Sequence, residues 1–145
     1  MMKQATISVV ICTYNGAKFV AKQLDSVLRQ TRPADEIIIQ DDGSTDATLT
    51  ILRDYATRYP AIRLFQNATT MGVNANFYSA MRRVQGDFIV LCDQDDLWEA
   101  DKLERQLAAI GHRLLCGGRS VPFSEDGSFV YQDPRRPNTT ALRMM

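Results

Sequence analysis

The stretch Phe88-Ile89-Val90-Leu91-Cys92-Asp93-Gln94-Asp95-Asp96-Leu97-Trp98 decides the fold, because it joins an apolar run directly to a cluster of acidic residues. The apolar half is typical of a buried strand in a parallel sheet, so the acidic half lies at the carboxyl end of that strand. Carboxylates crowded this closely repel one another, which favours a divalent cation among them. The structural alternative is that Asp95 or Asp96 caps the following helix while Asp93 lies in a turn.

The chemistry of the acidic cluster indicates which ligand to expect. Hard cations such as Mg²⁺ and Mn²⁺ take oxygen ligands, and they commonly keep phosphate oxygens as further ligands. The cluster therefore predicts a Mg²⁺ or Mn²⁺ cofactor and a nucleotide diphosphate as its partner.

Composition and charge limit the classes of protein that need to be considered. The chain has 145 residues, 45% of them hydrophobic, and its 17 basic residues balance its 17 acidic ones. This balance gives no electrostatic footprint for nucleic acid. No apolar segment approaches the roughly 20 residues that span a bilayer, and the first residues have no signal-peptide character. We expect a cytoplasmic protein without a transmembrane segment, either free or at the cytosolic face of the membrane.

The cysteines and the single histidine show no pattern that indicates catalysis. Cys12, Cys92 and Cys116 have no metal-ligand spacing, and Cys12 and Cys92 both end apolar strand patterns. We expect both to be small buried hydrophobic residues. His112 follows a glycine after a predicted helix, so nothing connects it to either cysteine.

Short β-branched runs alternate with longer segments of helical period, which indicates a layered α/β fold with a mostly parallel sheet. Strands are predicted over 7–12, 36–40, 62–65 and 88–92, and helices over 17–30, 44/45–59 (with Ser44 or Thr45 as N-cap), from Gly72 onward, and over 99–110. From Gly111 the helical repeat stops. Short strands over 121–123 and 129–131 are predicted to form a hairpin across Asp126-Gly127. We therefore expect a domain over 1–110 and a short irregular or hairpin tail over 111–145.

Polar residues follow three of the predicted strands, at the strand ends where open α/β sheets bind ligands. The three polar stretches are Thr13-Tyr14-Asn15-Gly16, Asp41-Asp42-Gly43-Ser44-Thr45-Asp46 and the acidic cluster. Right-handed crossovers make the strand order 3-2-1-4 feasible, with helices on both faces. In that order the first strand lies between the second and fourth, and all three stretches converge on one crevice.

Each stretch suits part of a nucleotide. Tyr14 offers an aromatic face for stacking a base, and Thr13 and Asn15 offer hydrogen bonds that orient it. Asp42 can accept the imide hydrogen of uracil or thymine, or a ribose hydroxyl, and Gly43 permits a tight turn with positive φ. The alternative for both stretches is an ordinary turn, which the same residues satisfy.

The segment from Asn67 to Asn76 also admits two interpretations. Gly72 at the start of a helix would let backbone amides approach a phosphate or ribose, helped by the helix dipole. Ordinary N-capping by Asn74 is the alternative.

Taken together and in order, these motifs resemble the nucleotide-sugar-binding half of the family 2 glycosyltransferases, which are inverting enzymes of the GT-A fold. The resemblance covers roughly residues 5 to 110 and rests on the stretches 9–16, 40–46, 72–77 and 86–98 with Lys102-Leu103. It implies that Asp93-Gln94-Asp95 is the DxD motif, whose carboxylates hold the metal on the donor diphosphate and touch the ribose. It implies that Asp42 contacts the base, and that the segment containing Gly72 and Asn76 belongs to the donor site.

The resemblance also implies an activity. The run from Cys92 to Trp98 is similar to that of bacterial enzymes that build envelope polysaccharides, rhamnosyltransferases among them. We therefore expect a metal-dependent glycosyltransferase that takes a UDP- or dTDP-linked sugar and a saccharide or lipid-linked saccharide acceptor.

The chain departs from the family after the acidic cluster, where members continue into an acceptor-binding region with an acidic catalytic base. Glu125, Asp126 and Asp133 are the only carboxylates in the tail, and Glu125-Asp126-Gly127 is also typical of a hairpin turn. A fragment or subunit that binds a donor without turnover stays an alternative, as does a sugar nucleotidyltransferase. An incomplete half-domain would leave apolar surface that a second copy could cover in a homo-oligomer.

Overall fold

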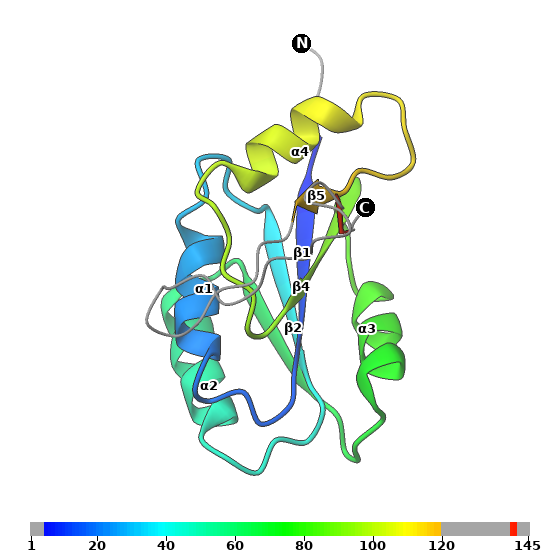
Figure 1. The fold of residues 1–145 in the computed structure, drawn as a ribbon. Helices are drawn as coiled ribbons and strands as arrows, with labels where there is room; N and C mark the ends of the chain where they lie inside the picture. Colours follow the sequence, from blue (N-terminus) through cyan, green and yellow to red (C-terminus); the bar gives the residue numbers. More distant parts are fainter. Residues whose placement is uncertain (1–4, 120–139, 142–145) are drawn as a thin grey trace, which may run out of the picture.

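The computed structural model describes residues 5–119 and 140–141, and a parallel four-stranded sheet forms its centre (Figure 1). The strands are β1 (Ile7–Thr13), β2 (Glu36–Asp41), β3 (Ile62–Gln66) and β4 (Phe88–Asp93), in the order β3-β2-β1-β4. The predicted fold class and strand order are confirmed. Every strand runs in the same direction, so all carboxyl ends lie at one edge of the sheet.

The strand register brings the end of β1 between the ends of its two neighbours. Cys12 of β1 is paired with Gln40 of β2 on one side and with Asp93 of β4 on the other. β1 is buried along its whole length because strands flank both its edges and helices cover both its faces. This explains why its sequence is a continuous apolar run rather than an alternating one.

Helices cover both faces of the sheet. Helices α1 (Val20–Leu28) and α2 (Thr48–Arg58) lie side by side on one face, and α3 (Val73–Met81) lies on the other (Figure 1). Helix α4 (Lys102–Ile110) lies at the end of the sheet where β1 begins. Two short strands, β5 (Gly118–Arg119) and β6 (Thr140–Ala141), form an antiparallel pair.

The apolar core is divided by the sheet into two layers. The larger layer contains Leu24 of α1, Leu52 of α2 and Leu103 of α4, each with none of its surface exposed. Burying a leucine of this kind contributes about 1.5–3 kcal/mol. Cys92 belongs to this layer and Cys12 to the smaller layer beneath α3, so both are buried as predicted and they point to opposite faces.

Two helices begin later than predicted because the preceding residues are used in turns. The carbonyl of Gly16 accepts hydrogen bonds from the N–H groups of Phe19 and Val20, so a tight turn precedes α1. Ser44 and Thr45 are not the N-cap of α2, which begins at Thr48. The side chain of Asp46 accepts the N–H of Thr48 instead, at 2.9 Å.

The boundaries of α3 and α4 also differ from the prediction. Asn74 is not an N-cap, because Gly72, with a φ of 86°, directly precedes the first residue of α3. Helix α4 begins at Lys102 rather than Glu99. The carbonyls of Glu99 and Ala100 accept hydrogen bonds from the side chain of Gln30 and from the N–H of Thr31, so this segment packs against the end of α1 instead of coiling.

The predicted strands over 121–123 and 129–131 and the turn at Asp126-Gly127 lie outside the described residues. Among the helices of the described part, none is long and apolar enough to cross a bilayer.

Candidate functional site

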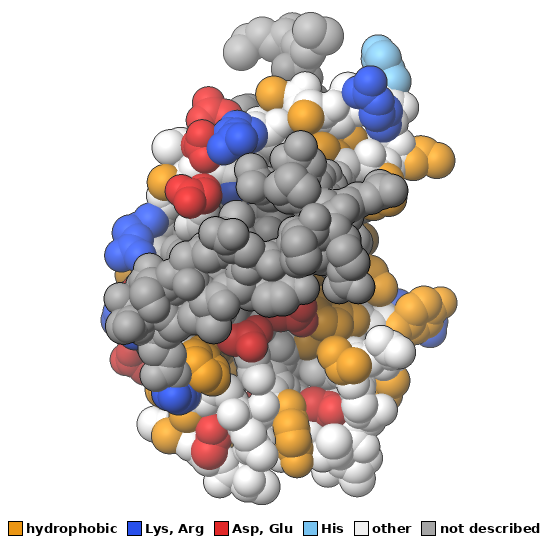
Figure 2. All heavy atoms as spheres, viewed as in Figure 1, with side chains coloured by type: hydrophobic (Ala, Val, Ile, Leu, Met, Phe, Trp, Pro, Cys, Tyr) orange, Lys and Arg blue, Asp and Glu red, His pale blue; other side chains and the backbone are white. Residues whose placement is uncertain are grey.

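The loops that follow β1, β2 and β4 meet at the carboxyl edge of the sheet. The N–H of Asp42 donates to the carbonyl of Thr13 at 2.8 Å, which joins the first two loops. The N–H of Tyr14 donates to the side chain of Gln94 at 2.9 Å, which joins the first loop to the acidic one. Figure 2 shows acidic and exposed hydrophobic side chains gathered in the lower half of this face, where the strands of Figure 1 end.

The thiol of Cys12 reports on the charges around the end of β1. Burial raises its pKa most, and the charges of Asp93 and Asp42 raise it further. The geometry agrees, because Asp93 is the neighbour of Cys12 across the strands and the N–H of Asp42 bonds the carbonyl of Thr13. Asp42 and Asp93 come from loops separated by the whole of α2, β3 and α3, and the sheet brings them together with Tyr14.

The loop after β1 combines one exposed ring with two engaged polar side chains. Tyr14 is 49% exposed and is available for stacking. The hydroxyl of Thr13 is buried and donates to Asp41 at 2.8 Å. Asn15, with a φ of 48°, accepts the N–H of Thr45 at 2.8 Å through its side chain. Thr13 and Asn15 thus connect the loop to its neighbour, while Tyr14 faces solvent.

Asp41 and Asp46 build the turn after β2. The carboxylate of Asp41 accepts the N–H groups of Gly43 and Ser44, at 3.1 and 2.9 Å. Asp46 accepts the N–H of Thr48 at the start of α2. Gly43 has a φ of 83°, a conformation that favours glycine. The turn expected as the structural alternative therefore exists, but Asp42 takes no part in it.

Asp42 instead faces the segment before α3. Its Oδ1 accepts from the side-chain amide of Asn67 at 2.6 Å and from the N–H of Met71 at 2.8 Å, and its Oδ2 accepts from the N–H of Gly72 at 2.8 Å. Burial of the carboxyl raises its pKa, but these hydrogen bonds outweigh the burial and hold the pKa below its ordinary value. Asp42 is therefore a buried, ionised acceptor with few acceptor positions left.

The lowered pKa of Asp42 predicts a loss of stability in acid. Asp35, Glu36 and Asp46 share the shift, because hydrogen bonds to each carboxyl outweigh its burial. A carboxyl with a lowered folded-state pKa stabilises the fold above its unfolded pKa, about 4, and this contribution is lost as the pH falls through the folded value.

The Asp42→Asn substitution tests whether the Asp42 carboxylate contributes to this loss of stability in acid. We expect it to lower the free energy of unfolding at neutral pH by about 1–3 kcal/mol, because the NH₂ group of the introduced amide would face N–H groups that donate to Asp42 in the wild type. It should lose less stability than the wild type between neutral pH and about pH 3, as measured by urea unfolding. Equal losses for the two proteins would contradict the prediction.

The acidic loop exposes the two carboxylates predicted to bind a cation, Asp93 and Asp95. Within the described ranges, no group of three His, Cys, Asp or Glu side chains converges as a metal cage. In proteins, Mg²⁺ is commonly held by one or two carboxylates together with substrate phosphates.

Gln94, between those two carboxylates, fixes the acidic loop against the loop after β1. Its Oε1 accepts the N–H of Tyr14 at 2.9 Å, and its Nε2 donates to the carbonyl of the same residue at 3.1 Å. Gly16 makes room for this contact, since a Cβ there would lie 2.2 Å from the Gln94 Oε1. Sequence reasoning considered only the carboxylates and missed Gln94.

A buried polar stripe, formed by Gln23 and Ser26 of α1 and by Gln30 just beyond its end, holds β4 and the segment that follows it. The hydroxyl of Ser26 accepts the N–H of Trp98 at 3.1 Å, and Gln30 accepts the N–H of Leu103 at 3.0 Å. Gln23 donates to the sulfur of Cys92. The spacing of Gln23, Ser26 and Gln30 places all three on one side of the chain, but no local signal shows that this side is buried.

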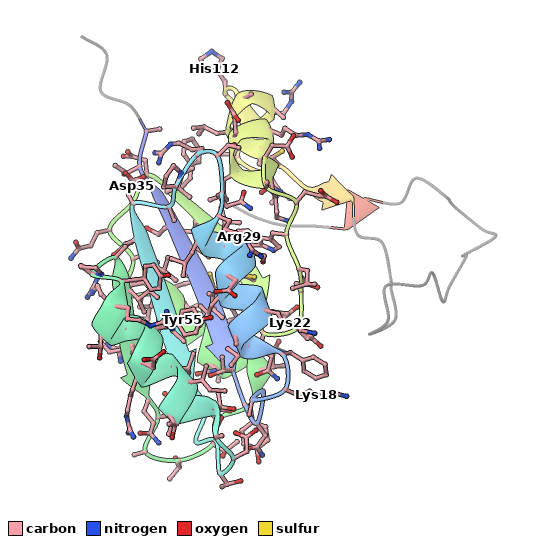
Figure 3. All side chains as sticks on the ribbon, turned by 90° about the vertical axis from the view of Figure 1, so that its left-hand side faces the viewer. Lys18, Lys22, Arg29, Asp35, Tyr55 and His112 are labelled. Atoms are coloured by element: carbon pink, nitrogen blue, oxygen red, sulfur yellow. The ribbon has the colours of Figure 1, made fainter. Side chains whose placement is uncertain are left out.

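His112, for which the sequence indicates no role, lies far from the loops of the site, whereas Asn76, a predicted site residue, lies close to Asp42. Figure 3 shows His112 beyond α4, at the end of the molecule away from Lys18, which lies in the loop before α1. Asn76 is buried behind Asp42, where its Oδ1 accepts from Asn67 at 2.8 Å. Glu125 and Asp126, the candidates for a catalytic base, lie outside the described residues.

Comparison with known proteins gives a family and a set of structural relatives. Residues 8–144 match the family described as Glycosyl transferase family 2. The chain is 37% identical over 128 residues to TuaG of Bacillus subtilis (strain 168), whose name assigns it to teichuronic acid biosynthesis as a glycosyltransferase. The match covers 88% of the chain and 48% of TuaG, so the chain spans about half the length of this relative.

Two solved structures share the fold. The mannosyltransferase PcManGT from Pyrobaculum calidifontis, in complex with GDP-Man and Mn²⁺, has a TM-score of 0.73 and 26% identity. S. aureus TarS 1-349 in complex with UDP-GlcNAc has a TM-score of 0.69 and 28% identity. The similar regions cover 85% and 81% of the chain but only 37% of each solved structure.

Proposed function

The chain belongs to glycosyl transferase family 2, and we propose that it forms the donor-binding part of an enzyme that transfers a sugar from a nucleotide diphosphate to an acceptor hydroxyl. The observation that carries the proposal is the convergence of Asp42 and Asp93 beside the end of β1, next to the exposed ring of Tyr14. The neighbours with bound GDP-Man and UDP-GlcNAc support a nucleotide-sugar ligand.

The nucleoside contacts follow from the loop geometry. Tyr14 stacks on the base with its exposed face, and Asp42 accepts a hydrogen from the edge of the base. Thr13, Asn15, Gly43 and Asn76 hold these two groups in position, because their contacts lie within the loops that carry them. Gly72 supplies the backbone turn that brings its N–H to Asp42.

The diphosphate belongs beside Asp93 and Asp95. These exposed carboxylates would hold Mg²⁺ or Mn²⁺, and the cation would neutralise the charge that develops on the departing nucleotide diphosphate. Gln94 and the polar stripe of α1 orient the loop that carries both carboxylates. The neighbour complexed with Mn²⁺ supports this assignment.

The reaction itself also needs an acceptor and a base. The family resemblance implies inversion at the anomeric carbon, in which a carboxylate takes the proton of the acceptor hydroxyl. A role in polysaccharide synthesis is supported by the name of TuaG, which mentions teichuronic acid biosynthesis. The family resemblance implies the rest of the proposal, namely a location in the cytoplasm, at the cytosolic face of the membrane, and a saccharide or lipid-linked saccharide acceptor. Rhamnose stays the predicted donor sugar, on the resemblance of the acidic run alone.

Calorimetric titration of the full chain tests the proposal. We expect UDP, dTDP or GDP to bind in the presence of Mn²⁺ and to bind at least about tenfold more weakly when EDTA removes the cation. Failure of every nucleoside diphosphate to bind with Mn²⁺ present would overturn it. Release of pyrophosphate from a nucleoside triphosphate and a sugar phosphate would show a nucleotidyltransferase instead.

A hydrolysis assay separates a complete enzyme from a donor-binding unit. Slow hydrolysis of the nucleotide sugar that binds most tightly would show that the chain activates the donor bond by itself. Metal-dependent binding without hydrolysis or transfer would show a donor-binding unit that depends on further protein for the acceptor side.

A further inference from the structure

A chain of hydrogen bonds connects Asp42 to an arginine that follows α3. The Nε of Arg83 donates to the Oε1 of Gln40 at 3.1 Å, and the Nε2 of Gln40 donates to the Oδ1 of Asn67 at 2.5 Å. The Nδ2 of Asn67 then donates to the Oδ1 of Asp42 at 2.6 Å. We call these four residues the Arg83–Asp42 relay.

The two ends of the relay determine its direction. A guanidinium can only donate hydrogen bonds and an ionised carboxylate can only accept them. Gln40 must therefore turn its oxygen to Arg83 and its NH₂ to Asn67, and Asn67 must turn its NH₂ to Asp42. Any reversed amide in the middle would place oxygen against oxygen and nitrogen against nitrogen.

Neighbouring contacts hold the relay in place. The guanidinium of Arg83 lies over the ring of Phe65, with its Cζ 4.1 Å from the ring centroid. Asn76 donates to the backbone carbonyl of Gln40 at 3.0 Å and accepts from Asn67 at 2.8 Å, so it favours the same orientation of Asn67. Gln40 and Asn76 are almost fully buried, which makes an unpaired or reversed amide costly.

The relay leaves Asp42 with little choice of partner. A carboxylate has about four acceptor positions, and the three hydrogen bonds from Asn67, Met71 and Gly72 use most of them. The position that is left accepts a hydrogen and cannot give one. A base with a ring N–H on that edge satisfies it, whereas a base with an acceptor nitrogen there places two acceptors face to face.

We propose that Arg83, Gln40 and Asn67 are positioning residues that keep Asp42 a pure acceptor, so that the site selects bases with a ring N–H, namely uracil, thymine or guanine, over cytosine and adenine. This inference rests on the proposed function, because it requires a nucleotide at Asp42. The inference adds to the donor site three residues that do not contact the nucleotide but determine which kind of base binds.

Two pairs of nucleotides measure the selection in the full chain with Mn²⁺. UDP and CDP differ on the base edge that meets Asp42 while sharing ribose and diphosphate, and GDP and ADP form the purine pair. UDP and GDP are the members with a ring N–H. The variants are then measured with the pair to which the tighter binder of these two belongs. We expect that member to bind about 30-fold more tightly than its partner in the wild type, the size expected when a buried acceptor is left unpaired.

The Arg83→Met variant removes the donor but keeps an apolar stem over Phe65. We expect the selectivity ratio, the affinity for the N–H member of the pair divided by that for its partner, to fall about fivefold, the loss expected for one hydrogen bond. Unfolding is measured beside it, because the buried Oε1 of Gln40 loses its donor. Arg83→Lys, which can still donate to Gln40, should recover most of the ratio. Arg82→Met removes the adjacent exposed arginine, which is not part of the relay, and should leave the ratio unchanged.

The Gln40→Glu variant inverts the relay with a change of one atom. The introduced carboxylate would pair with Arg83 and present an acceptor to Asn67, whose oxygen would then turn toward Asp42. We expect the selectivity ratio to fall at least about tenfold, because a donor to Asp42 is replaced by an acceptor. If this buried substitution prevents folding, the Arg83 series decides the question alone.

The outcomes separate this inference from the function on which it rests. Binding of no nucleotide overturns both. Binding without selection in the wild type, or selection that Arg83→Met leaves intact, overturns the relay and leaves the proposed function standing. A lower ratio in Arg83→Met that Arg83→Lys restores supports the relay, since a merely structural defect would weaken both members of the pair equally.

Discussion

Replacing Asp95 with asparagine is expected to weaken Mn²⁺-dependent nucleotide binding by about 100-fold, because partners in the outer shell alone contribute about 10–100-fold to metal affinity and Asp95 is proposed as a direct ligand. The amide keeps the size of the side chain and loses the charge that attracts the cation. Asp95 is exposed in the acidic loop, so its replacement should change the free energy of unfolding by less than about 0.5 kcal/mol.

The matched control for Asp95→Asn is Asp54→Asn on α2. Asp54 is also exposed, and it pairs with Arg58 on the same helix. An exposed ion pair of this kind contributes little to stability, and we expect Mn²⁺-dependent affinity to be unchanged. Calorimetry with and without Mn²⁺ and thermal unfolding of all three proteins check the result. An Asp95→Asn variant that unfolds while its folded fraction still binds would show that the acidic loop is a structural feature.

Much of the fold could be predicted because it depends on patterns that extend over many residues. Four apolar runs separated by helical segments predict a parallel sheet, and the right-handed crossover rule restricts the order of the strands. That order places the polar ends of β1, β2 and β4 together, so Tyr14, Asp42 and Asp93 could be expected in one place before any coordinates. The helix boundaries could not, because they depend on single hydrogen bonds such as that from Thr31 to Ala100.

The different roles of adjacent polar residues could not be predicted from the sequence. Asp41 and Asp42 are chemically identical, yet one builds the turn after β2 and the other faces Asn67 and the segment before α3. The strand period ends at this point, so it cannot assign directions to the two side chains. Gln40 presents the same difficulty, since a glutamine after three isoleucines could equally mark the solvated end of a strand.

Polar residues buried by another part of the chain were missed for a related reason. Gln23, Ser26 and Gln30 follow the helical period beside an apolar stripe, where polar side chains usually face solvent. They are buried because β4 and the segment after it cross them: Gln23 bonds Cys92 of β4, and Ser26 and Gln30 bond residues beyond it. A local pattern contains no information about a partner that lies about seventy residues further along the chain.

The contact between Gly16 and Gln94 leads to the second large expected effect. An added Cβ at Gly16 would lie 2.2 Å from the Oε1 and 2.6 Å from the Cδ of Gln94, so the glutamine side chain must leave its place. The side chain is flexible and can turn toward solvent, and the fold should therefore tolerate the change. Both hydrogen bonds to Tyr14 are lost, however, and the acidic loop loses its contact with the loop after β1.

We expect Gly16→Ala to lower nucleotide affinity about 30-fold in the presence of Mn²⁺, the equivalent of about 2 kcal/mol for two hydrogen bonds that order the site. A double-mutant cycle with Gln94→Ala isolates the cause. Gln94→Ala alone should cost a similar amount, and adding Gly16→Ala to it should cost almost nothing further, because the three atoms nearest to the methyl group all belong to the side chain that has been removed. A Gly16→Ala penalty of the same size in both backgrounds would mean that the glycine acts on the nucleotide directly and that Gln94 does not align the two loops.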